Sequence, residues 1–382
     1  MSNKVILPGQ TIGIIGGGQL GRMMAISAKE MGFNVAVVDP TPNSPCGQVA
    51  DIEIVAAYSD LDAIQRLAEV SDVITYEFEN IDVKALQYLE EHAHLPQGSE
   101  LLKITRNRFT EKNAIQSLGI SVAPFQLVET EKDFYNAIDM LSLPTVLKTT
   151  TGGYDGKGQV VVRSEADYSE AIALLNQTTC ILEAWVPFEK EISIIVARNP
   201  RGEVTTFPIA ENVHVNQILH TSTVPANISN EVGAKAHQFA EKIANAFHLV
   251  GVLAIELFVT KDGEVYVNEL APRPHNTGHY SMNACETSQF GQHVRAICNW
   301  PLGSTNLLKP VVMVNVLGEH VEKVLNAIPF YKELHVHLYG KAECKTGRKM
   351  GHINIIEEST TSAMQIVEKL EIWKHNSMEV HS

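Results

Sequence analysis

The sequence lacks the features that mark secreted, zinc-binding and membrane proteins. Its five cysteines are odd in number and scattered without C-x-x-C spacing, so neither a disulfide framework nor a zinc site is expected. No apolar run approaches the roughly 20 residues that span a bilayer. The N-terminus has only Lys4 before a short apolar run broken by Pro8 and Gly9, unlike a signal peptide. We therefore expect a cytoplasmic protein with reduced thiols and no membrane partner.

Positive charge is also scarce. The formal net charge is −14 at pH 7, and phosphate backbones are bound by basic surfaces, so nucleic acid is not expected as a partner. A local cluster of lysine and arginine is then interpreted as a small-molecule site. Because 382 residues are many for one hydrophobic core, and because we find no internal repeat, we expect two or three different domains.

The first hundred residues alternate between strand and helix patterns, which predicts a parallel sheet with helices on its faces. The expected strands cover residues 11–15, 34–38 and 73–76, and the expected helices cover 22–31, 60–69 and 83–92. Gly16, Gly18 and Gly21 satisfy G-x-G-x-x-G, and Asp39 lies close to the usual position of a ribose-binding acid. Two interpretations remain open: a nicotinamide or flavin site, or a tight turn whose helix N-terminus serves another ligand.

Two acids follow the third of these strands. Ligands of open α/β sheets bind outside the carboxyl ends of the strands, so Glu77 is expected to converge with the glycine-rich loop. Glu79 is expected to be a solvated charge. Pro96, Gly98 and the polar residues near them suggest a domain boundary.

A glycine-rich stretch containing Lys157 lies between two β-type runs, 145–149 and 159–163. Glycines let backbone N–H groups approach phosphate oxygens, and nearby lysines such as Lys148 add positive charge, which indicates a phosphate-binding flap. It is not a Walker loop, because a strand rather than a helix follows Gly158. A solvent-exposed hairpin is the simpler alternative.

Two further acids flank a short apolar segment. Glu183 lies in a predicted strand at 180–186, and Glu191 begins the next β run. Carboxylates in these places can accept hydrogen bonds from an adenine amine and from ribose hydroxyls, although such residues are more often only strand-end charges.

A predicted hairpin gives the strongest chemical inference. Two β runs, 253–259 and 264–269, flank an Asp-Gly turn signal, and a two-residue turn at 262–263 would place Glu256 opposite Glu269. Like charges facing each other destabilise a sheet unless a cation lies between them, and Mg²⁺ prefers carboxylate and phosphate oxygens. The alternative is that one carboxyl is protonated or that both splay into solvent.

Two basic segments follow. Arg273 is bracketed by prolines, which holds it on a rigid loop suited to anion recognition. His275 and His279 are interpreted as substrate contacts or ordinary loop residues, because the prolines and Gly278 rule out the continuous helix that a metal motif needs. The loop at 340–352 is a phosphate clamp or a solvated hairpin.

Five motifs together resemble one family. They are GGGQLGRM at 16–23, YEFEN at 76–80, GGYDGKGQ at 152–159, APRPHNTGH at 271–279 and GRKMGH at 347–352. The flap and the hairpin resemble the ATP-grasp superfamily, and the motifs resemble its 5-(carboxyamino)imidazole ribonucleotide synthases of de novo purine synthesis. The resemblance covers nearly the whole chain.

The resemblance implies a mixed α/β and α+β fold in three domains: a Rossmann-like domain at 1–105, a central ATP-grasp domain at 106–305 and a small β-rich C-terminal domain at 306–382. It implies a homodimer that joins ATP, bicarbonate and 5-aminoimidazole ribonucleotide, with Mg²⁺ as cofactor. The implied products are the N-carboxylated ribonucleotide, ADP and phosphate, formed through carboxyphosphate.

The same resemblance implies roles for individual residues. Those implied for ATP are Arg108, Lys148, Gly153, Tyr154, Asp155, Gly156, Lys157, Gly158, Gln159, Glu183, Ala184, Trp185, Val186, Glu191, His214, Asn268 and Glu269. Those implied for the ribonucleotide are Gln19, Leu20, Glu77, Asp155, Lys157, Arg273, His275, Lys341 and Arg348. Catalytic roles fall to Asp155, Arg273 and Lys148, and metal binding to Glu256 and Glu269. Lys345 departs from the family pattern, which has arginine there, and receives no role.

Two other functions remain open. A nicotinamide-dependent oxidoreductase would use the loop at 16–21 with Asp39, but it leaves the carboxylate hairpin unexplained. A nucleotide-sensing protein would bind ATP yet release no phosphate with any substrate.

Overall fold

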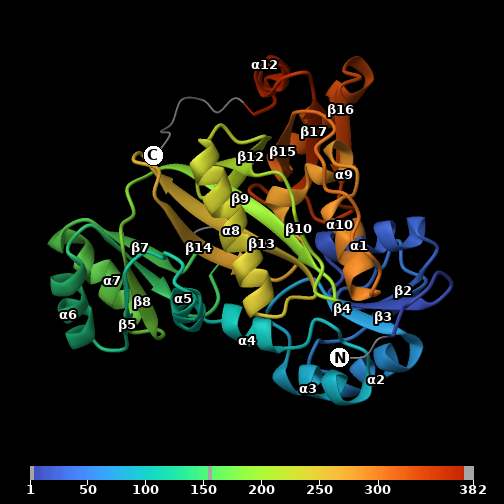
Figure 1. Cartoon of the computed structure of the whole chain (residues 1–382), viewed down its shortest axis with the longest axis horizontal. Helices are drawn as coiled ribbons and strands as arrows, with labels where there is room; N and C mark the ends of the chain where they lie inside the picture. The colour runs from blue at the N-terminus through green and yellow to red at the C-terminus, as the bar shows by residue number, and fades with distance from the viewer. Residues whose placement is uncertain (1–3, 154–156, 374–382) are drawn as a thin grey trace.

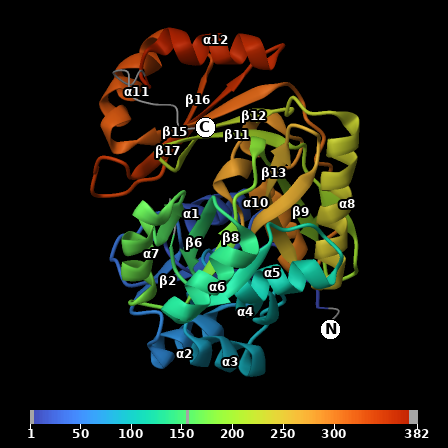
Figure 2. The ribbon, with the colours of Figure 1, turned by 90° about the vertical axis from the view of Figure 1, so that its left-hand side faces the viewer.

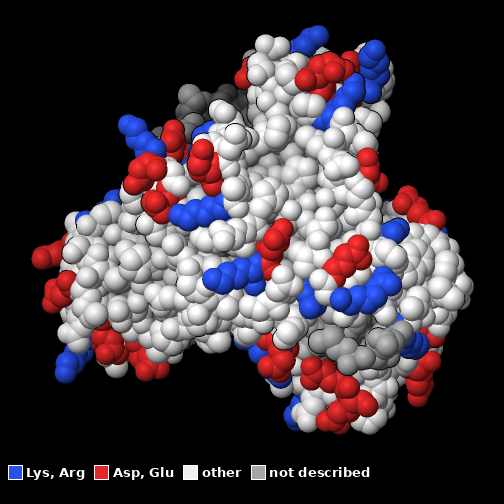
Figure 3. Space-filling view, viewed as in Figure 1, with Lys and Arg blue, Asp and Glu red and all other residues white. Residues whose placement is uncertain are grey.

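The computed structural model describes residues 4–153 and 157–373. Three sheets organise these residues, and Figures 1 and 2 show an N-terminal α/β layer, a small helix-covered sheet and a large sheet. None of the helices in the described part of the chain is long and apolar enough to cross a membrane. On the face seen in Figure 3, acidic and basic side chains are interspersed.

The N-terminal sheet is parallel, with strand order β3-β2-β1-β4. Its strands are β1 (Thr11–Ile15), β2 (Asn34–Asp39), β3 (Ile52–Val55) and β4 (Val73–Tyr76), and its helices are α1 (Gln19–Glu30), α2 (Leu61–Val70) and α3 (Val83–His92). The predicted Rossmann-like layer is confirmed. Strand β3 was not predicted, and α1 begins before the predicted residue 22, directly after the glycine-rich turn.

The small sheet is antiparallel, with order β5-β8-β6-β7. Its strands are β5 (Phe125–Val128), β6 (Thr145–Thr149), β7 (Gln159–Val162) and β8 (Cys180–Ala184), and the helices packed on it are α6 (Glu131–Leu141) and α7 (Tyr168–Leu175). Helices α4 (Glu100–Thr105) and α5 (Arg108–Ser117) precede this sheet and contact β14 (Val265–Ala271) of the large sheet. Phe134 of α6 and Ala171 of α7 pack with Leu147 and Leu182 in one core. One face of this sheet is thereby covered, which leaves the other for polar residues.

The large sheet has nine strands, eight of them in the order β14-β13-β9-β11-β12-β15-β17-β16, with β10 paired to β9. The strands are β9 (Phe188–Arg198), β10 (Val204–Thr206), β11 (Ala210–Val215), β12 (Ile218–Val224), β13 (Gly251–Thr260), β14 (Val265–Ala271), β15 (Val311–Leu317), β16 (Leu334–Leu338) and β17 (Lys349–Ile356). The remaining helices are α8 (Asn230–Ala246), α9 (Ser281–Ala284), α10 (Gln289–Ile297), α11 (Val321–Ala327) and α12 (Thr360–Leu370).

The predicted C-terminal segment does not form a sheet of its own. Strand β15 pairs with β12, so the strands on either side of residue 306 belong to one continuous sheet (Figure 1). Helix α10 joins the layers in a second way, because its Phe290 and Val294 pack with Met23 and Met24 of α1. The N-terminal layer and the strands on both sides of residue 306 are therefore in direct contact with the central part of the chain.

The hairpin of β13 and β14 pairs Glu256 with Glu269, as the sequence predicts. The predicted two-residue turn at 262–263 is wrong, however. The Thr260 N–H donates to the Glu264 carbonyl at 3.0 Å, so three residues form the turn.

A β-bulge compensates for this extra turn residue. Val259 lies opposite Val265, a register one residue away from the one that would pair the two glutamates. Asn268 is the extra residue in β14, and beyond it Glu256 again faces Glu269. The bulge therefore decides which side chain faces Glu256.

Candidate active site

The two facing carboxylates form the first part of the site. Burial and the charge of Glu269 raise the pKa of Glu256. Burial also works to raise the pKa of Glu269, but Arg108, Lys148 and Arg273 together outweigh it and lower that pKa. The Arg108 Nη1 lies 3.2 Å from Glu269 Oε2. Two carboxylates that repel each other on one face provide the oxygen ligands that Mg²⁺ takes together with phosphate. The residues present fit a divalent cation.

A cluster of cations lies beside this pair. Lys148 of β6 reaches Glu183 of β8, with Nζ 3.0 Å from Oε2. Lys112 of α5 lies 3.3 Å from the same oxygen and is 1% exposed. Burial works to raise the pKa of Glu183, but the two lysines outweigh it and lower the pKa to about 2. The uncovered face of the small sheet thus presents positive charge close to a fixed carboxylate.

Helix α5 supports the bulge from both sides. The Lys112 ammonium donates to the Asn268 carbonyl at 3.3 Å, and Glu111 Oε1 accepts from the Leu270 N–H at 2.8 Å. Burial and the charge of Glu269 raise the pKa of Glu111 to about 8. Residues 108, 111 and 112 are spaced so that they share one helix face. The family resemblance implies a role for Arg108 alone, because the other two act through this packing.

Two residues predicted for the nucleoside lie on β9 and β11, in the same large sheet as the carboxylate hairpin. His214 of β11 pairs with Glu191 of β9, with 2.5 Å between Nδ1 and Oε2, and Glu191 lies opposite Phe258. The Phe258 ring stacks on Phe188 at 4.5 Å between centroids. An aromatic platform next to an acid and a histidine suits a nucleoside.

A cavity of about 680 Å³ lies next to this region. Its lining includes Ala184 at the end of β8, Trp185 and Val186 directly after it, and Thr260 and Tyr266 of the hairpin. The three residues after Glu183 that were predicted to hold adenine therefore border an open space. The carboxylate of Glu183 itself is directed to the two lysines, so a role for this side chain on adenine remains a prediction.

The glycine-rich loop is closed by two acids of the same domain. Glu77 accepts hydrogen bonds from the N–H groups of Gly18 and Gly21, the latter at 2.6 Å. Asp39 accepts from the Gly17 N–H at 2.7 Å and from the Tyr58 hydroxyl at 2.6 Å. The anion position at the N-terminus of α1 is therefore filled by a side chain, which argues against a dinucleotide site.

Arg273 is held across two domains. Its Nε lies 2.8 Å from Glu79 Oε1, and its Nη1 donates to the Pro274 carbonyl at 3.2 Å. The expectation that Glu79 is a solvated charge is wrong, because the loop after β4 brings it against the proline-bracketed arginine. His275 lies nearby, with Nε2 3.8 Å from Glu256 Oε1, and burial holds the pKa of its ring well below the usual range.

The two residues predicted for the substrate phosphate, Lys341 and Arg348, lie in one C-terminal loop, and Lys341 contacts the N-terminal domain. Lys341 Nζ donates to Gln19 Oε1 and to the Lys349 carbonyl, each at 2.6 Å. Arg348 Nη1 donates to the Glu343 carbonyl at 2.9 Å, at the surface. The first contact brings a C-terminal loop to the start of α1, as the substrate prediction requires.

The remaining predicted residues are only partly described. Leu20 packs as a partly buried residue against the N-terminal core. At the base of the flap, the Thr149 N–H donates to the Gly158 carbonyl at 2.9 Å, and Gly153 has a φ of 77°. Tyr154, Asp155 and Gly156, which include the predicted catalytic acid, lie outside the described residues.

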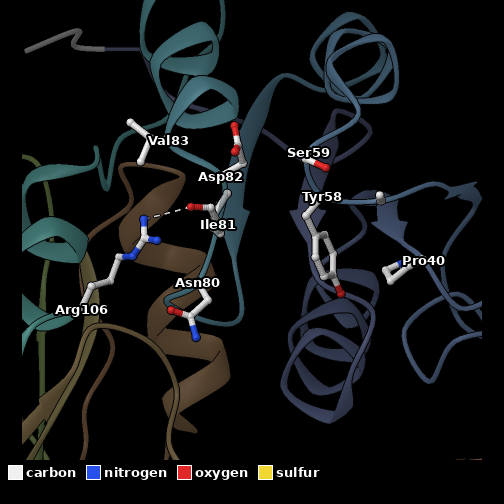
Figure 4. A pocket seen from close by; sticks show the side chains of 9 residues that line it. Pro40, Tyr58, Ser59, Asn80, Ile81, Asp82, Val83 and Arg106 are labelled. Carbon is white, nitrogen blue, oxygen red and sulfur yellow. Dashed lines mark hydrogen bonds between the residues drawn. The ribbon is translucent and has the colours of Figure 1, made fainter. Parts of the chain in front are cut away.

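A second cavity, of about 490 Å³, lies at the carboxyl ends of β2, β3 and β4 (Figure 4). Pro40, Tyr58, Asn80 and Arg106 contribute to its lining. Arg106 points to the Ile81 carbonyl and donates to it at 3.0 Å. This cavity is lined by residues outside the predicted site.

Three family models match consecutive parts of the chain. The ribonucleotide synthetase preATP-grasp domain matches residues 9–106, the ATP-grasp domain matches 113–290, and the phosphoribosylaminoimidazole carboxylase C-terminal domain matches 311–366. With the cation cluster and the paired carboxylates in place, these matches define the chain as an ATP-grasp enzyme.

Whole-chain relatives narrow this class. The N5-carboxyaminoimidazole ribonucleotide synthase of Bacillus subtilis (strain 168) is 58% identical over 358 residues, covering 94% of both chains. That of Staphylococcus aureus (strain MRSA252) is 44% identical and covers 94% of this chain and 95% of its own. The chain belongs to the N5-carboxyaminoimidazole ribonucleotide synthase family.

Solved structures agree with this membership. An N5-carboxyaminoimidazole ribonucleotide synthetase in complex with ADP is 63% identical, with a TM-score of 0.96, and covers 97% of this chain and 99% of its own. The synthase of Aspergillus clavatus in complex with ADP and 5-aminoimidazole ribonucleotide is 30% identical, with a TM-score of 0.89, and covers 94% of this chain and 97% of its own.

Proposed function

We propose that this chain carboxylates the exocyclic amine of 5-aminoimidazole ribonucleotide, using ATP and bicarbonate and releasing ADP and phosphate, as a step of purine (IMP) synthesis. The observation that carries the proposal is the convergence of the cations of α5 and β6 with the facing Glu256 and Glu269. A homodimer in the cytoplasm, with Mg²⁺ as cofactor, completes the proposal.

At the nucleotide end, Lys148 and Arg108 bind the phosphates, and the flap at 153–159 covers them. Glu191 and His214 bind the ribose, and the segment after Glu183 borders adenine. Glu256 and Glu269, with Asn268 beside them, hold the metal, which when bound neutralises phosphate charge. Bound phosphates would offset the burial that lowers the pKa of Lys148 in this site.

At the substrate end, Lys341 and Arg348 bind the ribonucleotide phosphate, next to Gln19 and Leu20. Arg273 and His275 bind the ribonucleotide next to the carboxylates; the 3.8 Å between His275 Nε2 and Glu256 Oε1 supports this part of the proposal. Lys157 and Glu77 complete the predicted set, although Glu77 serves chiefly by shaping the glycine-rich loop.

The chemistry follows from the weakness of bicarbonate as an electrophile. Transfer of the γ-phosphoryl group gives carboxyphosphate, whose carbon, or the carbon dioxide it releases, is attacked by the amine. Positioned cations stabilise the charge that develops, and a closed flap keeps water from the intermediate. Asp155 is proposed to accept the amine proton.

The experiment is phosphate release from Mg-ATP and bicarbonate, with and without 5-aminoimidazole ribonucleotide, together with detection of the carboxylated product. Release that depends on the ribonucleotide and matches product formation is expected. If the chain binds ATP but the ribonucleotide changes nothing, the substrate assignment is wrong. Nucleotide binding without phosphate release under any condition would favour a sensor.

A further inference from the structure

Lys112 is a buried lysine to which the reaction scheme above gives no task. Its side chain is 2% exposed, and its ammonium contacts Glu183 Oε2 and the Asn268 carbonyl, each at 3.3 Å. Removing a lysine charge from water is costly unless anionic or polar groups surround it. The position therefore needs a reason beyond hydrophobic packing.

The partner of Lys112 is shared. Lys148, the lysine proposed to bind the ATP phosphates, lies 3.0 Å from the same oxygen of Glu183. A single carboxylate therefore serves two ammonium groups, and the three side chains carry a net charge of +1. The nearby Arg108 is already paired with Glu269. Without Lys112, Glu183 would neutralise Lys148 alone, and the net charge facing the phosphates would fall to zero.

The second contact of Lys112 concerns the carboxylate hairpin. Asn268 is the bulged residue that turns Glu269 toward Glu256, and Lys112 binds its carbonyl. One ammonium thus contacts both the carboxylate under Lys148 and the backbone that orients the metal-binding face.

We propose that Lys112 is a positioning residue of the ATP site: it occupies Glu183 so that the charge of Lys148 remains available to the nucleotide phosphates. This inference rests on the proposed function, because it concerns the same nucleotide site. Lys112 is then a third cation of the ATP site, in addition to Arg108 and Lys148, which the family resemblance implies. Glu183 then neutralises one of the two lysine charges, and Lys112 supplies that charge.

The test uses four variants of the full chain: Lys112→Met, Glu183→Gln, the double variant, and Lys235→Met as a control. Lys235 lies in an ion pair with Glu264 that is partly exposed, with side chains 32% and 54% exposed. The affinity for ADP is measured by calorimetry at low salt, the KM for ATP is measured in steady state, and thermal unfolding checks the fold.

Lys112→Met is expected to weaken ADP binding by about tenfold or more, since a hydrogen bond to a charged group contributes about 1.5–3 kcal/mol. The double variant again has a net charge of +1, because Glu183→Gln frees Lys148, and it is expected to recover at least about threefold of this loss. A purely structural lysine would show no such rescue. The Lys235→Met control is expected to bind ADP as the parent does.

Parental ADP affinity in Lys112→Met, or a double variant that binds more weakly than Lys112→Met, would overturn the inference. If Lys112→Met does not fold, Glu183→Gln alone decides: affinity within about threefold of the parent supports the inference, and a loss beyond tenfold overturns it. A parent chain that does not bind ADP would overturn the proposed function as well, whereas failure of the variants alone leaves that function standing.

Discussion

The ion pair between Glu79 and Arg273 makes a quantitative prediction. The two side chains are 25% and 20% exposed, with 2.8 Å between Oε1 and Nε. Exposed pairs contribute about 0–1 kcal/mol, and breaking a buried pair costs about 3–5 kcal/mol. A half-buried pair falls between these limits, at roughly 2 kcal/mol, which corresponds to about 30-fold in a rate or binding constant.

The perturbation is Glu79→Gln, which keeps the shape and removes the charge. If Arg273 must be oriented for the ribonucleotide or for the developing anion, kcat/KM for 5-aminoimidazole ribonucleotide should fall by about 10- to 30-fold. ADP affinity should change by less than about twofold, because Glu79 and Arg273 are not among the residues proposed to bind the nucleotide. Steady-state kinetics measure kcat/KM, and calorimetry measures the affinity for ADP.

The matched control is Glu358→Gln, which breaks the pair with Lys309, whose side chains are 82% and 53% exposed. Glu358→Gln should leave both kcat/KM for 5-aminoimidazole ribonucleotide and the affinity for ADP unaltered. A Glu79→Gln enzyme with parental kcat/KM, or one whose ADP affinity falls in step with its activity, would refute the claim that Glu79 orients Arg273.

Three further predictions follow from other parts of the structure. Glu269→Gln should abolish magnesium-dependent turnover while leaving the urea unfolding curve near that of the parent; retained activity would contradict the metal assignment. Gly18→Ala would place a Cβ 2.5 Å from Glu77 Oε1, and should cost roughly 1–3 kcal/mol in the free energy of unfolding; an unchanged urea midpoint would argue against the clash. Burial lowers the pKa of His293 to about 3, so as the pH falls this histidine takes up its proton in the unfolded chain before it does so in the folded one. The stability that comes from keeping His293 neutral is complete above about pH 6.5 and is lost toward pH 3, by up to about 1.4 kcal/mol per pH unit. Urea midpoints in the parent that stay flat from pH 7.5 to pH 5 would contradict this reasoning.

Much of the site could be predicted because its signals are local. Glu256 and Glu269 lie on one hairpin, so a turn signal and period-two counting bring them together. The counting reached the correct pair although the turn has three residues, since the bulge at Asn268 cancels the error. A bulge is decided by what packs on the strand, here Lys112, and a single sequence carries no clear sign of it.

The parts that could not be predicted depend on contacts between distant segments. Glu79 looked like a surface charge because nothing near it in sequence reveals Arg273 as its partner. The glycine fingerprint correctly indicates a strand-to-helix turn, but the anion that fills it is the side chain of Glu77, which directly follows β4. Local sequence patterns therefore predict where a binding loop forms, but they do not predict which group binds to it.

The continuous large sheet has a consequence for the order in which the protein is assembled during synthesis. Strand β12 ends at Val224, but its outer neighbour β15 begins only at Val311, and β17 follows still later. Until those residues leave the ribosome, β12 is an edge strand with unpaired backbone groups, open to pairing with another chain. The sheet that carries Glu191, His214 and Glu256 is thus completed only after β15, β16 and β17 have been synthesised, later than the other two sheets.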